Sequence, residues 1–396
     1  MAGYRSHKVV VFAFITLAAF NAFGAEGSYV HSSGIWVGAG VANPRDASWM
    51  VLNPAGLVDL DRRLDVDLSI AITDVTMEPH GLFGNHFVDK MTDHQYFFLT
   101  SGGLVWPTGK GALALGSYTS AGFAVDFPQP RNFFTRMLQG NADRRLRYQQ
   151  TQLVLAGARE LGHNWSIGGS LKGSLSLGRT DNFTRFLHPT RGDNRWDQAL
   201  GAGLSIGVYK KWDKWAFAAC YHTPQWSERF EKYKDLLRWS VDLPEIVQLG
   251  VAYHVTPEVE LVLDYRFLHW EDCAFFAGHP HEGGLGWKDE HVVSLGVEWH
   301  PADRWTLRSG VSHGNGPVQP EYASVNGLTC VVTENYACAG ASYKLNERSE
   351  VHVNYVRALY NEMRAWPPGD VFTWLTASTE IGLGYDALVL GYTFKF

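Results

Sequence analysis

Residues 310–314 contain the residue types of a serine nucleophile. They run Gly-Val-Ser-His-Gly and match the pattern G-x-S-x-G. A nucleophile elbow needs a strand, a sharp turn and then a helix. The segment Asn-Gly-Pro-Val-Gln-Pro-Glu-Tyr follows here, which is typical of a loop. The motif therefore does not predict a hydrolase, although a phospholipid turnover that Ser312→Ala abolishes would favour one.

A second segment carries metal-binding residue types. His279, His281 and Glu282 share one loop, but the spacing His-Pro-His-Glu fits no zinc pattern and indicates a solvated loop. The sequence has no phosphate-binding glycine loop and no redox motif. We therefore predict no enzyme, no catalytic residues, no metal and no cofactor.

The four cysteines also fit no zinc spacing. They are Cys220, Cys273, Cys330 and Cys338. A Cys330–Cys338 bridge suits an oxidising compartment, and free thiols are the alternative. The sequence leaves both open.

The composition is unusual for a soluble enzyme. Of 396 residues, 14% are aromatic and 41 are glycine, while the mean hydropathy is only −0.16. Many short alternating strands with aromatic girdles produce this combination. The net charge of −6 predicts no nucleic-acid partner.

The first 25 residues have the layout of a cleaved signal peptide. Arg5, His7 and Lys8 give a basic start, residues 9–20 are apolar, and small residues follow at 22–25. The apolar stretch is shorter than the ~20 residues that span a bilayer. Export without a membrane anchor is the prediction.

Alternation with a period of two recurs from residue 64 to the end, at 258–267, 292–299, 305–312 and most clearly in the last ten residues. The apolar face of that final strand carries Leu388, Leu390, Tyr392, Phe394 and Phe396. A soluble sandwich buries such a face. A membrane barrel turns it toward lipid and keeps charges in the lumen. Alternation alone does not separate the two, but export and the connections do.

The connections alternate between tight turns and long loops. Tight turns are expected near residues 107–110, 161–164, 212–214, 256–257, 301–303 and 346–348. Long loops are expected at about 78–92, 127–146, 181–196, 227–243, 274–288, 316–333 and 361–375. Six turns and seven loops join 14 strands, the even count of a closed outer-membrane barrel. We predict an all-β, antiparallel, transmembrane barrel over 64–396.

A barrel of this size needs a plug, because wide barrels leave an aqueous lumen. Residues 26–63 precede the first strand and are too compact for a linker. The turn Asn53-Pro54-Ala55-Gly56 is well defined, since proline fixes φ and asparagine bonds its own backbone. These four residues and Asp46 are the predicted plug and gate, with an ordinary turn as the alternative.

Several segments resemble one known family. GAGVANPRDASWMVLNPAGL (38–57) resembles the amino-terminal hatch of the FadL-type outer-membrane transporters of long-chain fatty acids and other hydrophobic compounds. Residues 221–230, 242–270, 287–318 and 336–356 match family patterns in order, and Phe396 ends the chain.

The resemblance implies a 14-stranded barrel with a plug in the bacterial outer membrane. It also implies passive uptake: hydrophobic molecules are captured at the outer loops, enter the lumen and leave sideways into the membrane. Long-chain fatty acids are the expected cargo, with aromatic hydrocarbons as an alternative. Trimmed outer loops leave the cargo size open.

Two outer loops are expected to form short amphipathic helices that make an apolar capture groove. The groove residues are Phe133, Phe134, Met137 and Leu138 in one loop, and Phe230, Tyr233 and Leu237 in the other. Burying an alkyl chain there yields ~0.8 kcal/mol per CH₂. Packing on the barrel rim is the alternative.

The same loops are basic, which favours binding of lipopolysaccharide phosphates over capture of a carboxylate. Inside the lumen, Arg266, Arg308 and Lys172 are candidates for a cargo carboxylate, although lumen cations more often pair with carboxylates of the protein.

Lateral release needs a break in the wall. The segment 113–127 is the best candidate, because glycine inside a strand marks a bulge or a close approach of backbone. Gly116, Ser120 and Gly122 are the predicted exit, and a small-residue patch against the plug is the alternative.

The leading hypothesis is thus a transport barrel that acts as a monomer in outer-membrane lipid. A porin for small polar solutes is the second hypothesis, and a constitutive ion conductance would favour it.

Overall fold

The computed structural model describes residues 40–81, 90–128, 144–181, 195–235, 237–365 and 376–396. The predicted signal peptide, residues 1–25, lies outside the described residues, as do the first residues of the predicted plug.

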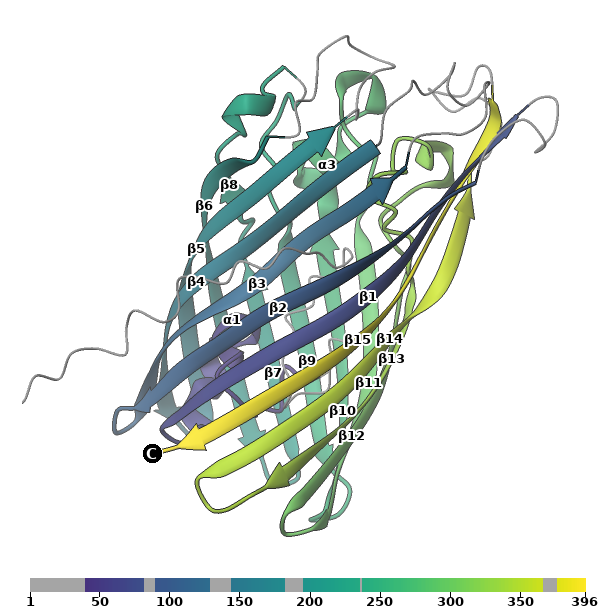
Figure 1. The fold of residues 1–396 in the computed structure, drawn as a ribbon. Helices are drawn as coiled ribbons and strands as arrows, with labels where there is room; N and C mark the ends of the chain where they lie inside the picture. The colour runs from purple at the N-terminus through teal and green to yellow at the C-terminus, as the bar shows by residue number, and fades with distance from the viewer. Residues whose placement is uncertain (1–39, 82–89, 129–143, 182–194, 236, 366–375) are drawn as a thin grey trace, which may run out of the picture.

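Antiparallel strands make up nearly all of the described chain (Figure 1). The first half contains β1 (Arg63–Gly81), β2 (Met91–Pro107), β3 (Gly111–Phe127), β4 (Arg144–Gly162), β5 (Trp165–Asp181), β6 (Asp197–Trp212), β7 (Trp215–His222) and β8 (Trp226–Ser227). The second half contains β9 (Glu245–His254), β10 (Val259–His269), β11 (Glu290–Ala302), β12 (Trp305–Gly314), β13 (Asn335–Lys344), β14 (Ser349–Arg364) and β15 (Thr376–Lys395).

The sheet closes on itself. Each long strand pairs with its neighbours in sequence, and β1 pairs with β15 from Arg63↔Lys395 onward. The two-residue β8 only extends the pairing of β6. In the described part of the chain, fourteen long strands therefore form the wall, which confirms the predicted 14-stranded antiparallel barrel.

The two faces of the wall are reversed relative to a soluble protein. Large apolar side chains point outward and are exposed, for example Leu153 at 62% and Leu171 at 58%. Polar and charged side chains such as Gln150, Asp264 and Glu298 point into the lumen and are buried. This arrangement suits a lipid bilayer, in which the outer face must be apolar and backbone groups in the wall must be paired. Among the described residues, no helix has both the length and the apolarity to cross a bilayer.

The six tight turns lie at one end of the barrel and the long loops at the other, as the sequence predicts. The chain also enters and leaves the wall at the tight-turn end, where the Phe396 N–H donates to the carbonyl oxygen of Arg62 (3.0 Å). By the same alternation, the long-loop end is the outer end.

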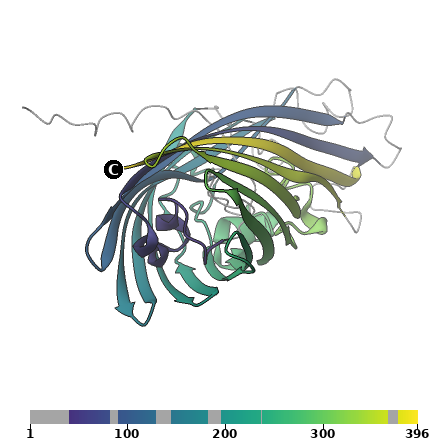
Figure 2. The same cartoon turned by 90° about the horizontal axis from the view of Figure 1, so that it is seen from below.

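Short helices lie inside the wall or in the long loops. Two precede β1: α1 (Trp49–Leu52) and η2 (Pro54–Asp59). The loops hold η4 (Glu231–Tyr233), η5 (Trp270–Asp272), α3 (Ala274–Ala277), η6 (Pro280–Glu282) and η7 (Pro320–Tyr322). Figure 2, seen from below, shows α1 and η2 enclosed by the ring of strands.

Buried apolar side chains form three groups in the described part of the chain, and two of them lie at different levels of the barrel. One group packs around α1 and η2 and includes Trp49, Met50 and Leu57. Another lies toward the outer end and includes Phe123 and Phe276. The barrel is therefore filled from both ends.

Candidate functional site

Residues 40–62, called the lumen segment below, lie within the barrel near the tight-turn end. Asn53 caps η2, because its Oδ1 accepts the Ala55 N–H (3.1 Å) and Pro54 occupies the first helical position. The Asn53 side chain also donates to the carbonyl oxygen of Val208 on β6 (3.2 Å). The predicted Asn-Pro-Ala-Gly corner is thus fixed to the wall.

The wall accepts the backbone of the lumen segment at several points. The N–H groups of Gly40 and Val41 donate to Oδ2 of Asp264 on β10, at 2.9 and 2.8 Å. The Ala47 N–H donates to Oδ2 of Asp65 on β1 (2.8 Å). Buried backbone groups need such partners, so the carboxylates hold a segment that has little regular structure.

Ion pairs also join the lumen segment to the wall, and those of Arg45 reach two strands. Arg45 Nη2 lies 2.6 Å from both Glu260 on β10 and Glu298 on β11. The Asp46 carboxylate accepts the Ser48 N–H (2.7 Å). Arg45 therefore places one positive charge between the two wall glutamates, and Arg308 adds a second beside Glu298.

Glycine in the wall makes room for the lumen segment. A Cβ at Gly168 on β5 would lie 2.4 Å from the backbone nitrogen of Ala55, so no larger residue fits without displacing the turn. The neighbouring Ser166 Oγ donates to the Ala55 carbonyl oxygen (2.9 Å). Strand β5 and the Asn-Pro-Ala-Gly corner therefore pack closely against each other.

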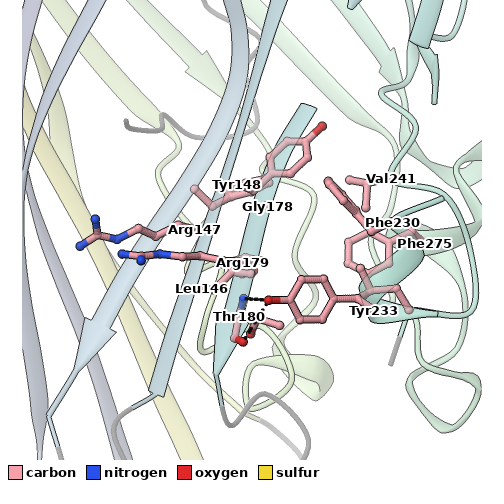
Figure 3. A pocket seen from close by; sticks show the side chains of 13 residues that line it. Leu146, Arg147, Tyr148, Gly178, Arg179, Thr180, Phe230, Tyr233, Val241 and Phe275 are labelled. Atoms are coloured by element: carbon pink, nitrogen blue, oxygen red, sulfur yellow. Dashed lines mark hydrogen bonds between the residues drawn. The ribbon is translucent and has the colours of Figure 1, made fainter. Parts of the chain in front are cut away.

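Above the lumen segment lies an aromatic hollow of about 550 Å³, partly open to solvent. Its apolar lining consists of Phe123, Leu146, Tyr148, Phe230, Tyr233, Leu237, Val241 and Phe275. The Tyr233 hydroxyl bonds to backbone of Thr180 and Arg195, so its ring is oriented and its polar atom is satisfied (Figure 3). The hollow therefore offers mainly carbon surface to an occupant.

The loop of residues 227–243 differs from its prediction. We expect an exposed amphipathic helix, but the described residues of this loop form only the three-residue η4, which is followed by a bond from the Leu237 N–H to the Tyr233 carbonyl oxygen (2.7 Å). Phe230 and Tyr233 are buried and face the hollow. The aromatic residues are drawn inward because the barrel interior offers more contact than the rim. Phe133, Phe134, Met137 and Leu138 lie outside the described residues.

A second hollow, of about 350 Å³, adjoins the first, and Phe123 and Thr329 line both. It is bounded by Phe97 of β2, residues 122–125 of β3, and parts of β1 and β15. Val331, in the loop between β12 and β13, closes it from the lumen side. That loop reaches deep into the barrel, where Leu328 and Cys330 are buried.

The wall is interrupted beside this second hollow. Strands β2 and β3 pair only from Pro107↔Ala112 to Gly102↔Ser117. Beyond that point β2 pairs with β1 alone as far as Met91, and β3 pairs with β4 alone as far as Phe127. The Asp126 N–H, which donates to Asp93 Oδ2 (2.7 Å), bridges the strands again near the outer end.

The three predicted exit residues occupy different places along this interruption. Gly116 still pairs with Gly103 and packs on the lumen segment, since a Cβ there would lie 2.9 Å from the Met50 sulfur. Ser120 sits at a bulge of β3 and donates to Gln150 Oε1 (2.9 Å). Gly122 lines the second hollow at the unpaired edge.

The three predicted carboxylate-binding cations line neither hollow. Arg308 Nε lies 2.7 Å from Glu298, and Lys172 Nζ lies 2.9 Å from Nδ1 of His222. Arg266 is buried on β10, two residues from Asp264. Arg308 thus pairs with a carboxylate of the protein, which is the alternative we gave, whereas Lys172 contacts a histidine.

Sequence reasoning missed several residues of the two hollows, among them Tyr148, Phe275 and Thr329. Tyr148 belongs to a strand without a distinctive pattern. The run Ala-Phe-Phe-Ala at 274–277 is an apolar signal in a loop and could have been noticed. Nothing in the sequence marks Thr329.

Neither the cysteines nor the one cluster of metal-ligating types found among the described residues offers further chemistry. All four cysteines are free and buried, so the predicted alternative of free thiols holds in the structure. Burial raises the pKa of the Cys273 thiol to about 12, which keeps it protonated and unreactive. Glu78, His80 and Glu380 lie close together, but Lys90 is 3.7 Å from Glu78 and His80 is 3.7 Å from Glu380. We assign no metal there.

Known proteins resemble this chain in sequence and in fold. A long-chain fatty acid transport protein of Escherichia coli is 19% identical over 322 residues, covering 64% of this chain and 71% of that protein. The P. putida toluene transporter TodX superposes with a TM-score of 0.69 at 14% identity, over 88% of this chain and 94% of that one. A Pseudomonas aeruginosa FadL homologue gives a TM-score of 0.66 at 14% identity, over 96% of this chain and all of the other.

The sequence model of a family described as outer membrane protein transport protein (OMPP1/FadL/TodX) matches residues 9–365. This span covers the lumen segment, the interrupted strands and nearly all of the wall. The chain therefore belongs to the OMPP1/FadL/TodX family of outer-membrane transport proteins.

Proposed function

We propose that the protein carries neutral hydrophobic molecules across the bacterial outer membrane without an energy source and releases them sideways into the bilayer. Cargo enters the aromatic hollow from the long-loop end, passes Phe123 and Thr329 into the second hollow, and leaves between β2 and β3. The polar outer layer of the membrane excludes such molecules, so a walled apolar path speeds their entry.

One observation carries this proposal. The interruption between β2 and β3 faces the second hollow, and the second hollow shares two lining residues with the aromatic one. These contacts support a continuous apolar route from the outer end to the side of the wall. An unpaired wall in lipid costs free energy, because each unsatisfied backbone group must find a partner. Such a cost is expected to persist only where it serves a purpose.

The lining favours a neutral cargo. Most described side chains that line the aromatic hollow are aromatic or aliphatic, with Thr180 and Thr329 as the polar exceptions, and Arg147 and Arg179 beside it point away from the rings (Figure 3). Aromatic rings stack well in such a box. We therefore propose aromatic hydrocarbons as the first cargo class. Long-chain fatty acids are the second candidate, favoured by the name of the E. coli relative.

Uptake of both cargo classes tests the proposal. Radiolabelled naphthalene and oleate are supplied to cells that lack their own transporter and that express either this protein or an empty vector. We expect faster naphthalene uptake with the protein and a smaller effect on oleate. Faster oleate uptake alone would assign the second cargo, and no difference for either would refute transport of hydrophobic molecules. Mass spectrometry of lipid that copurifies in detergent identifies any natural occupant.

We further propose that residues 26–63 form the plug, after cleavage of residues 1–25, and that 64–396 form the barrel. The bonds of Asn53 and the ion pairs of Arg45 support a plug that is fixed rather than hinged. With Asn53→Ala and Pro54→Ala together, uptake should slow while the barrel still folds, since the corner would lose its cap and its fixed φ. Unchanged uptake in this double variant would count against a gating role.

The remaining partners are proposals of the same kind. The exposed apolar belt supports contact with outer-membrane lipid, and the basic outer end supports contact with lipopolysaccharide. A closed wall with no unpaired long edge apart from the β2–β3 interruption supports a monomer, which the mass of the detergent-solubilised particle would test.

A further inference from the structure

Two arginines stand directly opposite each other on neighbouring strands. Arg147 on β4 pairs with Arg179 on β5 in the register of the sheet. Like charges in this position repel, and such pairs destabilise a sheet unless a counter-charge is present. The pair therefore needs an explanation that the transport pathway does not supply.

Both side chains lie on the outer face of the wall. Arg147 alternates in step with Leu153 and Leu155, which are 62% and 53% exposed to the lipid side. Arg179 likewise falls in step with Leu171 and Leu175. Figure 3 shows the two side chains extending in the same direction, away from the rings of Tyr148, Phe230 and Tyr233. They point toward the membrane, near the outer ends of β4 and β5.

The described neighbours leave this pair with little negative charge. Asp126 bonds mainly to Arg145, at 2.7 Å, and is 3.9 Å from Arg147. Asp181 stands opposite Arg145 in the register and not opposite the pair. Arg179 lies over the ring of Trp196, at 4.7 Å. The Nε atoms of Arg147 and Arg179 are both buried and have no hydrogen-bond partner.

We propose that Arg147 and Arg179 together bind the phosphate headgroup of a lipid in the outer leaflet. Two guanidinium groups side by side present several N–H donors to one oxyanion, which is the arrangement that phosphate prefers. The phosphate supplies the counter-charge that Asp126 gives only in part, and it accepts from the outer guanidinium N–H groups. The acyl chains of the same lipid would then lie along Leu153 and Leu175, on the same faces of the two strands.

The position of the arginine pair favours a lipid headgroup over free phosphate as the ligand. The pair sits on the face that contacts the bilayer, at the end where the outer headgroups lie, so an attached headgroup is held there at high local concentration. This inference rests on the outer-membrane orientation given above, but not on the nature of the cargo.

The test measures lipid retention by the full-length protein in detergent. Native mass spectrometry follows the binding of added bis-phosphorylated lipid A to the wild type and to Arg147→Gln with Arg179→Gln. We expect the wild type to retain one lipid A. The affinity of the double variant for lipid A should be lower by about tenfold or more, since each basic residue near anionic lipid contributes ~1 kcal/mol. Lipid A without its phosphates should not be retained by either protein.

A matched control removes two positive charges from the lipid-facing side of the wall, at the opposite end of the barrel. Arg159→Gln with Lys210→Gln changes the net charge equally at the tight-turn end, where Lys210 lies over Trp165. This control should retain lipid A as the wild type does. Equal retention by the Arg147/Arg179 variant, or equal loss in the control, would overturn the proposal. Displacement of lipid A by inorganic phosphate at about 10 mM would assign the site to free phosphate and overturn the lipid assignment.

Naphthalene uptake by the same variants separates this inference from the transport proposal. We expect the Arg147/Arg179 variant to keep uptake at the wild-type level, because neither side chain faces the route. Loss of lipid A with intact uptake supports the site, whereas absence of uptake in the wild type refutes only the transport proposal.

Discussion

At the scale of single residues, the pathway depends on where two hollows meet. Phe123 and Thr329 line both, and Thr329 Oγ1 is held by donation to the carbonyl oxygen of Asn326 (3.1 Å). Asn326 in turn accepts from Trp287 Nε1 (2.6 Å), which ties the inner loop to its neighbour. The junction of the two hollows is thus bordered by a fixed hydroxyl side chain and one ring.

Thr329→Trp should close this passage. An indole at this place fills both hollows, so we expect naphthalene uptake to fall by about tenfold or more while the protein still folds. Thr329→Ser, which keeps the hydroxyl and removes one methyl group, serves as the control and should transport normally. Uptake at the wild-type rate in Thr329→Trp would place the route elsewhere.

At the scale of elements, two interruptions of regular structure define the function proposed here. The stretch over which β2 and β3 do not pair with each other is the proposed side exit, and the lumen segment replaces regular sheet contacts with bonds from backbone to wall carboxylates. Both features place unpaired or irregular backbone where it lines a cavity, which is the condition under which a membrane protein tolerates it.

Gly122→Trp should block the side opening. The residue lies at the free edge of β3 and lines the second hollow, so an indole there obstructs the exit. Gly173→Trp is the matched control, because a Cβ at Gly173 on β5 has nothing within 4 Å and faces lipid. We expect lost naphthalene uptake in the first variant and normal uptake in the second. Normal uptake in both would reject this exit.

Arg45→Ala should loosen the lumen segment. Without Arg45, Glu260 and Glu298 keep their negative charges at close range with less compensation, and breaking a buried pair costs on the order of 3–5 kcal/mol. We expect a larger ion conductance in planar bilayers than the wild type gives. Arg45→Lys preserves the charge and should conduct less than Arg45→Ala. If the wild type already conducts freely, the porin hypothesis gains support instead.

At the scale of the whole molecule, the orientation of the two strand faces determines the environment in which the barrel is stable. The apolar face of each strand is outside and the charged face encloses the lumen, so the folded chain is stable only in an apolar surroundings. Closure between β1 and β15 removes the edges that an open sheet would expose.

Leu153→Arg tests this orientation against Leu161→Arg. Both leucines are on β4 and are 62% exposed, but Leu153 lies at mid-strand and Leu161 beside a tight turn. In a bilayer the first change should lower the free energy of unfolding by about 2–4 kcal/mol and the second by about 0–1 kcal/mol. Reversible urea unfolding in lipid vesicles measures both. Equal and small costs would mean that β4 does not face lipid.

Much of the fold was within reach of the sequence, and less of the site. The strand near residue 388 alternates so regularly that its two faces are evident from the residues alone, and the turns around 107–110 and 301–303 mark the tight-turn end. The apolar spacing of Phe230 and Tyr233 predicts a helix that carries a binding groove, but it does not indicate that the loop turns inward. Arg147 and Arg179 are 32 positions apart in sequence, and only their register on β4 and β5 makes them neighbours.

Features that depend on near neighbours along the chain can be read from the residues: alternation of strand faces, turn positions, strand number and the corner at Asn53. Features that depend on distant partners come from the folded barrel. Asp264 holds Gly40 across 224 positions, and Thr329 meets Phe123 only because a loop enters the barrel. The physical reason is that a period of two fixes the direction of each side chain locally, whereas closure of the ring fixes which of the inward side chains face one another.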